Sequence, residues 1–132
     1  MIAVGDLRKI AKAHLEDAMT LLAARRFDGA VYLCGYAVEV AIKGRICRTL
    51  RWSGFPDSAG EFRDLQSFRT HELDLLLRLS GIEARIRSGF PAEWSAISGW
   101  KPELRYRRPG TADRGGAEAM LQAAKVLTRA IS

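Results

Sequence analysis

The sequence predicts an all-α protein with four main helices and one short helix. Two long segments repeat apolar residues at helical spacing, and a third is apolar over most of its circumference. No segment shows the alternation of apolar and polar residues between turns that marks a strand. A chain of 132 residues can bury one core of its own. We therefore expect residues 1–132 to form a single helical domain.

The first helix is predicted over residues 6–25. One face of it carries Leu7, Ile10, Ala11, Leu15, Ala18, Leu21 and Leu22. His14 falls within this apolar stripe and is expected to lie in the core with a hydrogen-bond partner. Asp28 and Gly29 then predict a short break before the next helix.

The second helix is predicted to end near Leu50 and to lie at the centre of the bundle, because it is apolar nearly all the way round. Its polar residues form one seam, which consists of Tyr32, Tyr36, Glu39 and Lys43. Glu39 precedes Lys43 by four residues, the favourable order for an ion pair on a helix. The alternative is that the seam simply faces solvent.

Residues 51–69 are rich in turn formers and predict a long loop, with a short helical piece around Glu61–Gln66. Loops of this length are often functional. Thr70 is a candidate N-cap for a third helix, which carries Leu73, Leu76, Leu77 and Leu79 and ends at Gly81.

Two further helices complete the predicted fold. Phe90-Pro91 opens a short helix, because proline fits the first helical position. Thr111 or Asp113 can cap the final helix. One face of this helix carries Ala117, Met120, Leu121, Ala124, Leu127 and Ile131.

Positive charge is concentrated in residues 100–110, WKPELRYRRPG, which we call the basic segment. The net charge of the chain is +6, and this distribution favours an anionic partner. Arg105 and Arg108 carry planar guanidinium groups that can donate two parallel hydrogen bonds to a phosphate. Trp100 and Tyr106 carry aromatic rings on which a base could stack. Lys101 adds a further cation. The alternative is that Trp100 fills the core and that Glu103 pairs with an arginine.

His71 is the second candidate functional residue. It follows Arg69 and Thr70 at the expected start of the third helix. A helix N-terminus offers free N–H groups to an anion, so His71 is a candidate base or phosphate contact, with Arg69 beside it. The alternative is a side chain that packs in the capping region. The sequence has no Gly-rich phosphate loop and no metal-ligand spacing, so we expect neither a metal nor another cofactor.

The two cysteines and the N-terminal region indicate a cytoplasmic protein. Cys34 and Cys47 lie roughly 20 Å apart on one helix, too far for a disulfide, which favours a reducing compartment. We find no signal-peptide pattern, and the longest apolar run is too short to cross a bilayer.

The order of the motifs resembles the HEPN (higher eukaryotes and prokaryotes nucleotide-binding) domain family. The resemblance rests on AVYLCGYAVEVAIKG, THELDLLL, a tryptophan-bearing helix and WKPELRY, and it spans roughly Phe27 to Tyr106. It implies an up-and-down helical bundle, often a homodimer, that is frequently encoded beside a minimal nucleotidyltransferase in toxin–antitoxin or defence pairs. Nucleotide or RNA is then the expected ligand.

Many HEPN proteins are metal-independent endoribonucleases that use an arginine followed after four to six residues by a histidine. No histidine follows Arg105 here, and the only match to that spacing, Arg8 and His14, falls in the first helix. Three functions are therefore considered: binding of nucleotide or RNA together with a partner protein, RNA cleavage with His71 as base and Arg105 as charge stabiliser, and docking to an acidic protein. A homodimer is expected through apolar faces of the first two helices.

Overall fold

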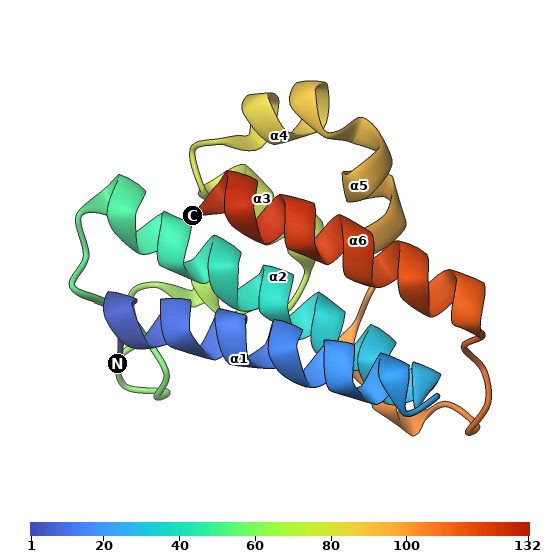
Figure 1. Cartoon of the computed structure of the whole chain (residues 1–132). Helices are drawn as coiled ribbons and strands as arrows, with labels where there is room; N and C mark the ends of the chain where they lie inside the picture. The colour runs from blue at the N-terminus through green and yellow to red at the C-terminus, as the bar shows by residue number, and fades with distance from the viewer.

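The computed structural model describes residues 1–132 and shows that the chain is mostly helical. Three helices are long: α1 (Val4–Ala23), α2 (Phe27–Leu50) and α6 (Arg114–Ile131). The helices α1 and α2 form an antiparallel hairpin, and α6 packs against both of them (Figure 1). The predicted all-α class is therefore confirmed at this level.

Three short helices and two 3₁₀ turns connect α2 to α6. The short helices are α3 (Leu73–Leu79), α4 (Glu83–Gly89) and α5 (Pro91–Ile97). The 3₁₀ turns are η1 (Gln66–Phe68) and η2 (Pro102–Tyr106). The structure thus has three long and three short α-helices where four main helices and one short helix were predicted.

The expected third main helix is short because Ser80 ends it. The Ser80 hydroxyl donates to the Leu77 carbonyl and accepts the N–H of Ile82, and Gly81 follows with a φ of 81°. Thr70 is not the N-cap of α3, since the helix begins three residues later. Its hydroxyl instead accepts the N–H of Glu72.

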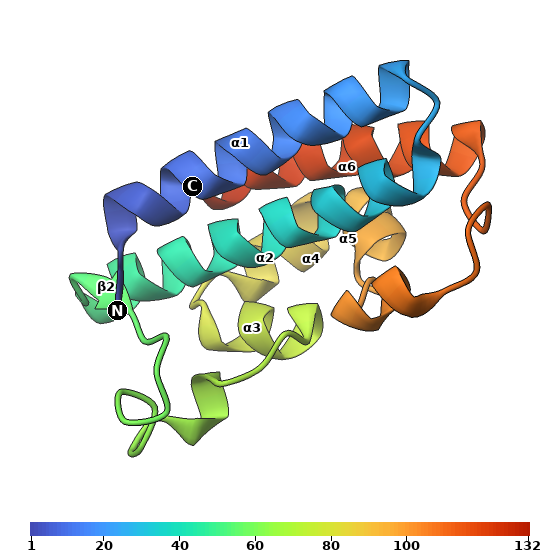
Figure 2. The same ribbon diagram turned by 90° about the horizontal axis from the view of Figure 1, so that it is seen from below.

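The centre of the fold is α2, as predicted. In Figures 1 and 2 it lies between α1 and α6 on one side and α3 on the other. Its buried residues include Cys34, Val38, Ile42 and Ile46, all with no exposed surface. Other helices of the same chain cover the apolar surface of α2, so this surface does not by itself require a second copy of the protein. The expected homodimer remains a prediction.

The connection between α1 and α2 differs from the expectation. The chain turns at Ala24–Arg26, with Arg25 in the left-handed region at a φ of 61°, and α2 begins at Phe27. Asp28 and the glycine after it therefore lie in the first turn of α2, where a carboxylate is favoured by the helix dipole. His14 is half-buried, with its ring centroid 6.0 Å from that of Tyr36.

The loop after α2 is fastened to the helices by aromatic residues and by a two-residue ribbon. Strand β2 (Gly54–Phe55) pairs antiparallel with β1 (Ile2–Ala3), a ribbon too short to leave an alternating pattern in the sequence. Phe55 and Phe62 are buried in the core. The predicted helical piece takes the form of η1, slightly later in the chain.

The predictions for the last two helices are confirmed. Pro91 occupies the first turn of α5. Asp113 caps α6, because its side chain accepts the N–H of Gly116 at 2.7 Å. The six apolar residues predicted for the inner face of α6 are all buried. Every helix falls short of the combination of length and hydrophobicity that a bilayer crossing demands.

Candidate nucleic-acid interface

Trp100 anchors the start of the basic segment to α2. It is 3% exposed, and its ring lies on Gly35 and packs edge-on against Tyr36, with 4.8 Å between the ring centroids. The indole N–H donates to the Tyr32 carbonyl at 3.1 Å. Trp100 therefore fills the core, and the expectation that a base stacks on its ring is wrong.

Asp28 holds the other end of the segment. Its carboxylate accepts the backbone N–H groups of Gly110 at 2.6 Å and Ala112 at 2.8 Å. These two amides, Ala112 foremost, lower the pKa of Asp28. The chain between Trp100 and Ala112 is thus fixed at both ends on the same helix, α2.

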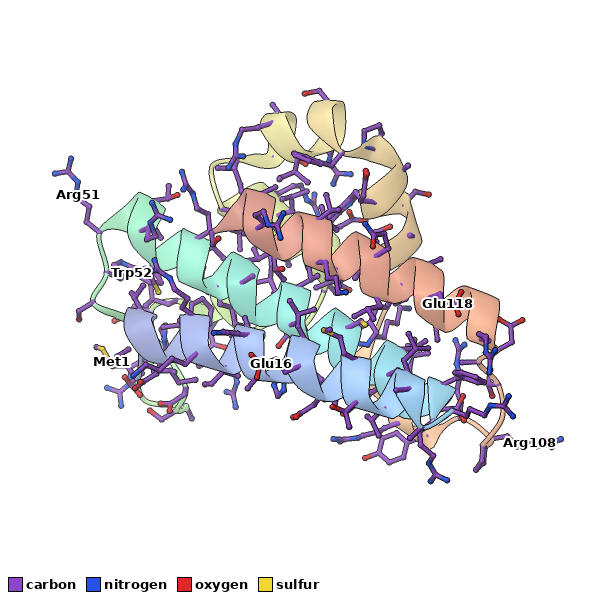
Figure 3. All side chains as sticks on the ribbon, viewed as in Figure 1. Met1, Glu16, Arg51, Trp52, Arg108 and Glu118 are labelled. Carbon is purple, nitrogen blue, oxygen red and sulfur yellow. The ribbon has the colours of Figure 1, made fainter.

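The arginines between these two anchors face solvent without a carboxylate partner. Arg105, Arg107 and Arg108 are exposed, and none of them forms an ion pair. Figure 3 shows Arg108 projecting from the end of the molecule. Glu103 forms no ion pair either, so the alternative that it neutralises an arginine of the segment is not supported.

These arginines line a concavity of about 500 Å³ between the basic segment and the start of α2. Its cations are Arg26, Arg105, Arg107 and Arg108, and we call it the arginine concavity. The only carboxylate in its wall is that of Asp28, which is already engaged by two backbone amides. The concavity is therefore strongly electropositive and offers several guanidinium groups to an anion.

Tyr106 lies at the edge of this region and is 75% exposed. Arg105 donates to its hydroxyl at 2.9 Å, and the guanidinium carbon of Arg105 lies 4.8 Å from the ring centroid. An arginine stacked in this way occupies one face of the ring. The exposed tyrosine thus holds Arg105 in place and presents an aromatic surface beside the concavity.

His71 belongs to a second polar cluster, centred on Glu39. The Glu39 side chain is only 3% exposed, and its two oxygens bind Lys43 Nζ at 3.2 Å and His71 Nδ1 at 2.8 Å. The predicted Glu39–Lys43 pair is confirmed, whereas the alternative of a solvated seam is wrong at Glu39. The neutral tautomer that fits this contact carries its proton on Nδ1, donates it to the Glu39 carboxylate and has Nε2 as its free acceptor.

Tyr36 lies between the two clusters. Burial, followed by the neighbouring Tyr32 hydroxyl, raises the pKa of Tyr36 to about 12. Its ring packs edge-on against Tyr32, with 5.0 Å between the centroids. Glu39 and Tyr32 are seven residues apart, or roughly 10 Å along the helix axis. Arg105 lines the same concavity as Tyr32, whereas His71 binds Glu39, so the two residues lie at different points along α2 and form no hydrogen bond with each other.

The remaining predicted contacts lie outside the arginine concavity. Lys101 is exposed but does not line it. Arg69 lies against the Phe62 ring, with 5.7 Å from its guanidinium carbon to the ring centroid. Sequence reasoning missed Arg26 in the wall and Glu39 as the partner of His71. The sequence contained one signal for Arg26, namely its position as a cation directly before the start of α2.

Arg8 and His14 do not form a joint site. Arg8 lines a groove between α1, α2 and α6, whereas His14 approaches Tyr36 on the seam of α2. No group of three or more His, Cys, Asp and Glu side chains is placed to hold a metal ion. No family model, curated protein or solved structure matches this chain.

Proposed function

We propose that this chain is a HEPN-like module that binds single-stranded RNA or a nucleotide through the arginine concavity. The observation that carries the proposal is the convergence of four arginines around a concavity whose one carboxylate is already engaged. Phosphate groups are well suited to bind these arginines, because each guanidinium group can donate two parallel hydrogen bonds.

Two features favour RNA or a nucleotide over an isolated inorganic anion. The exposed ring of Tyr106 adjoins the cations, and aromatic rings stack with bases irrespective of sequence. The volume of about 500 Å³ is in the range of small-ligand sites, about 300–1,000 Å³. The HEPN resemblance adds the proposal that the module acts as a homodimer with a partner such as a minimal nucleotidyltransferase in a toxin–antitoxin or defence pair.

The proposal is tested by the anisotropy of a fluorescent single-stranded RNA oligomer titrated with the protein. The double substitution Arg105→Ala/Arg108→Ala is expected to raise Kd about tenfold or more, about 1.4 kcal/mol. The slope of log K against log salt should fall by about 0.7 for each phosphate that the variant no longer neutralises.

The matched control is Arg63→Ala/Arg78→Ala, which also removes two exposed cations, one from the loop after α2 and one from α3. It should leave both Kd and the salt slope near their wild-type values. Equal losses in Arg63→Ala/Arg78→Ala and in Arg105→Ala/Arg108→Ala would show that RNA responds only to net charge, and the concavity would no longer be the proposed site.

The Glu39–His71 hydrogen bond favours a second candidate function, metal-independent RNA cleavage. A carboxylate that holds Nδ1–H leaves Nε2 free to accept a proton, and the His71 side chain is 57% exposed, so a ribose 2′-hydroxyl can reach it. Arg105 would stabilise the charge that develops on the phosphate. The separation of the two residues along α2 requires the RNA to lie along the seam.

Cleavage is tested with labelled RNA and a chelator at high protein concentration. We expect product that is lost in His71→Ala and reduced in Glu39→Gln, since the latter weakens the orientation of the imidazole. Lys43→Gln, which removes the other partner of Glu39, is the matched control for the polar cluster. Intact RNA after prolonged incubation with the wild-type protein would eliminate this candidate and leave the binding proposal unaffected.

A further inference from the structure

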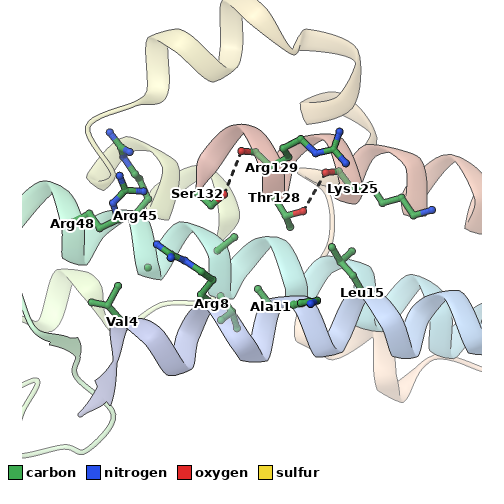
Figure 4. Close-up of a pocket in the computed structure, with 14 residues that line it drawn as sticks. Val4, Arg8, Ala11, Leu15, Arg45, Arg48, Lys125, Thr128, Arg129 and Ser132 are labelled. Atoms are coloured by element: carbon green, nitrogen blue, oxygen red, sulfur yellow. Dashed lines mark hydrogen bonds between the residues drawn. The ribbon is translucent and has the colours of Figure 1, made fainter.

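A second concavity lies on a different side of the molecule, between the three long helices. It has a volume of about 460 Å³ and we call it the α1/α2/α6 groove. In Figure 4, α1 forms one wall, α6 forms the other and α2 lies between them. It shares no lining residue with the arginine concavity.

Six cations line this groove, and none of its 14 lining residues is Asp or Glu. The cations come from all three helices: Arg8 and Lys12 from α1, Arg45 and Arg48 from α2, and Lys125 and Arg129 from α6. The only ion pair that any of them forms joins Lys12 to Glu16 at 4.0 Å, and both of those side chains are mostly exposed. Such a pair contributes little, so side-chain carboxylates leave the positive charge of the groove largely uncompensated.

Arg45 is recessed in the groove and incompletely satisfied. Its Nε is buried and has no hydrogen-bond partner. Burial, followed by repulsion from Arg48 and Arg85, lowers the pKa of Arg45. A buried donor without an acceptor is costly, and the repulsion between the half-buried Arg45 and its neighbouring cations adds to that cost. An anion in the groove would relieve both penalties.

Ordinary helix electrostatics explain only some of these cations. Arg48 and Arg129 lie in the last turns of α2 and α6, where the negative end of the helix dipole favours positive charge. Arg8 and Lys12 lie in the N-terminal half of α1, beyond its first turn, where the dipole gives them no such stabilisation. Their convergence with the cations of α2 and α6 therefore needs another cause.

The size and lining of the groove define the class of ligand. A helix of about 10 Å diameter occupies roughly 120 Å³ per residue, so the groove could hold only about four residues of one. No aromatic residue lines the groove, and its lining includes Val40 and the small residues Ala11, Ala41 and Gly44. A nucleobase would therefore find no stacking surface, in contrast to the region beside Tyr106.

We propose that the α1/α2/α6 groove binds a compact small molecule that carries several phosphate groups, such as a short inorganic polyphosphate or a multiply phosphorylated sugar. Cations from three helices surround the phosphates, and the small lining residues Ala11, Ala41 and Gly44 leave room for the ligand beside Arg45. This site is independent of the proposed RNA interface, because the two concavities have no residue in common.

The test is calorimetric titration of the full chain with sodium tripolyphosphate. Wild-type protein is expected to show saturable binding that weakens as salt is added, and inorganic phosphate should bind at least tenfold more weakly. Arg8→Gln/Arg129→Gln removes one exposed cation from each wall and should raise the Kd for tripolyphosphate at least tenfold. Circular dichroism of that variant verifies that it is folded.

Two matched controls separate this site from net charge and from the RNA interface. Arg63→Gln/Arg78→Gln removes two exposed cations elsewhere, and Arg105→Ala alters only the arginine concavity. Both variants should keep the wild-type Kd for tripolyphosphate. An equal loss in either control would overturn the proposal, as would the absence of saturable binding.

The class of ligand is tested with two competitors. Adenosine triphosphate should bind no more tightly than tripolyphosphate, since the base gains no contact. A glutamate-rich peptide of matched charge should bind at least tenfold more weakly. Markedly tighter binding of adenosine triphosphate, or equal binding of the peptide, would refute a site for compact polyphosphates.

Discussion

Replacing Gly35 with alanine is expected to destabilise this protein, although the same exchange stabilises most helices. A Cβ added at Gly35 would lie 2.1–2.2 Å from three ring atoms of Trp100. Real carbon atoms never approach so closely without a bond, so the ring must move. Trp100 is 3% exposed and is held by its hydrogen bond to the Tyr32 carbonyl, which leaves little room for a small adjustment.

Three magnitudes decide the size of the effect. Alanine is favoured over glycine in a helix interior by about 1 kcal/mol. Repacking around an inserted methyl group costs about 1–3 kcal/mol. Complete expulsion of a tryptophan re-exposes roughly 150–250 Å², worth roughly 4–6 kcal/mol. Since the overlap is too severe for repacking alone, the free energy of unfolding should fall by roughly 2–5 kcal/mol.

The assay is urea unfolding followed by circular dichroism and tryptophan fluorescence. Gly44→Ala is the matched control in the same helix, because a Cβ at position 44 would meet only Leu7 Cβ at 3.9 Å. It should raise the stability by up to about 1 kcal/mol. Adding Trp100→Leu to Gly35→Ala should cost much less than the sum of the single substitutions.

A Gly35→Ala protein as stable as the wild type would refute the reasoning, since Trp100 could not then lie on α2 at this point. The same variant carries a functional readout. Displacement of Trp100 frees the start of the basic segment, so the affinity for RNA should fall together with stability.

Three further outcomes follow from the ionisable groups. The amide resonances of Gly110 and Ala112 should titrate with the lowered pKa of Asp28, and Asp28→Asn should abolish this titration. The two hydrogen bonds that the Asp28 carboxylate accepts contribute stability above about pH 4, and this contribution is lost as the pH falls through the lowered pKa. Tyr36 should ionise near pH 12 in an absorbance titration at alkaline pH, and Tyr36→Phe should remove that step; stability falls as the pH rises from about 10 towards 12. Thiol reagents should label neither cysteine in the native protein, because both are buried and burial raises the pKa of Cys34 to about 12, whereas rapid native labelling would contradict that burial.

The first and last long helices could be predicted because each has a periodic pattern of apolar residues. The final helix shows this well, since its six apolar positions and its Asp113 cap all follow from local spacing. The central place of α2 follows equally directly from its surface, which is apolar nearly all the way round apart from one narrow polar seam. Helix α4 escaped prediction because it contributes a single fully buried residue, Ile86, which is too little for a periodic signal.

The candidate site could be predicted only in part, because its geometry depends on contacts between distant residues. Asp28 binds amides more than 80 positions away, and Glu39 binds His71 at a separation of 32 residues. A single sequence carries no mark of such pairings. Trp100 shows the opposite error, since an aromatic residue in a basic stretch resembles a stacking platform until the fold places it on Gly35.

The two attachments of the basic segment to α2 have a practical consequence. Trp100 clamps one end and Asp28 the other, so the residues between them can be exchanged with little effect on the helical core. Libraries that vary Glu103, Arg105 and Arg107 while keeping both clamps should therefore yield folded proteins with altered ligand preference. We therefore expect the basic segment to change its sequence, and with it the ligand preference of the protein, without accompanying changes in the helical core.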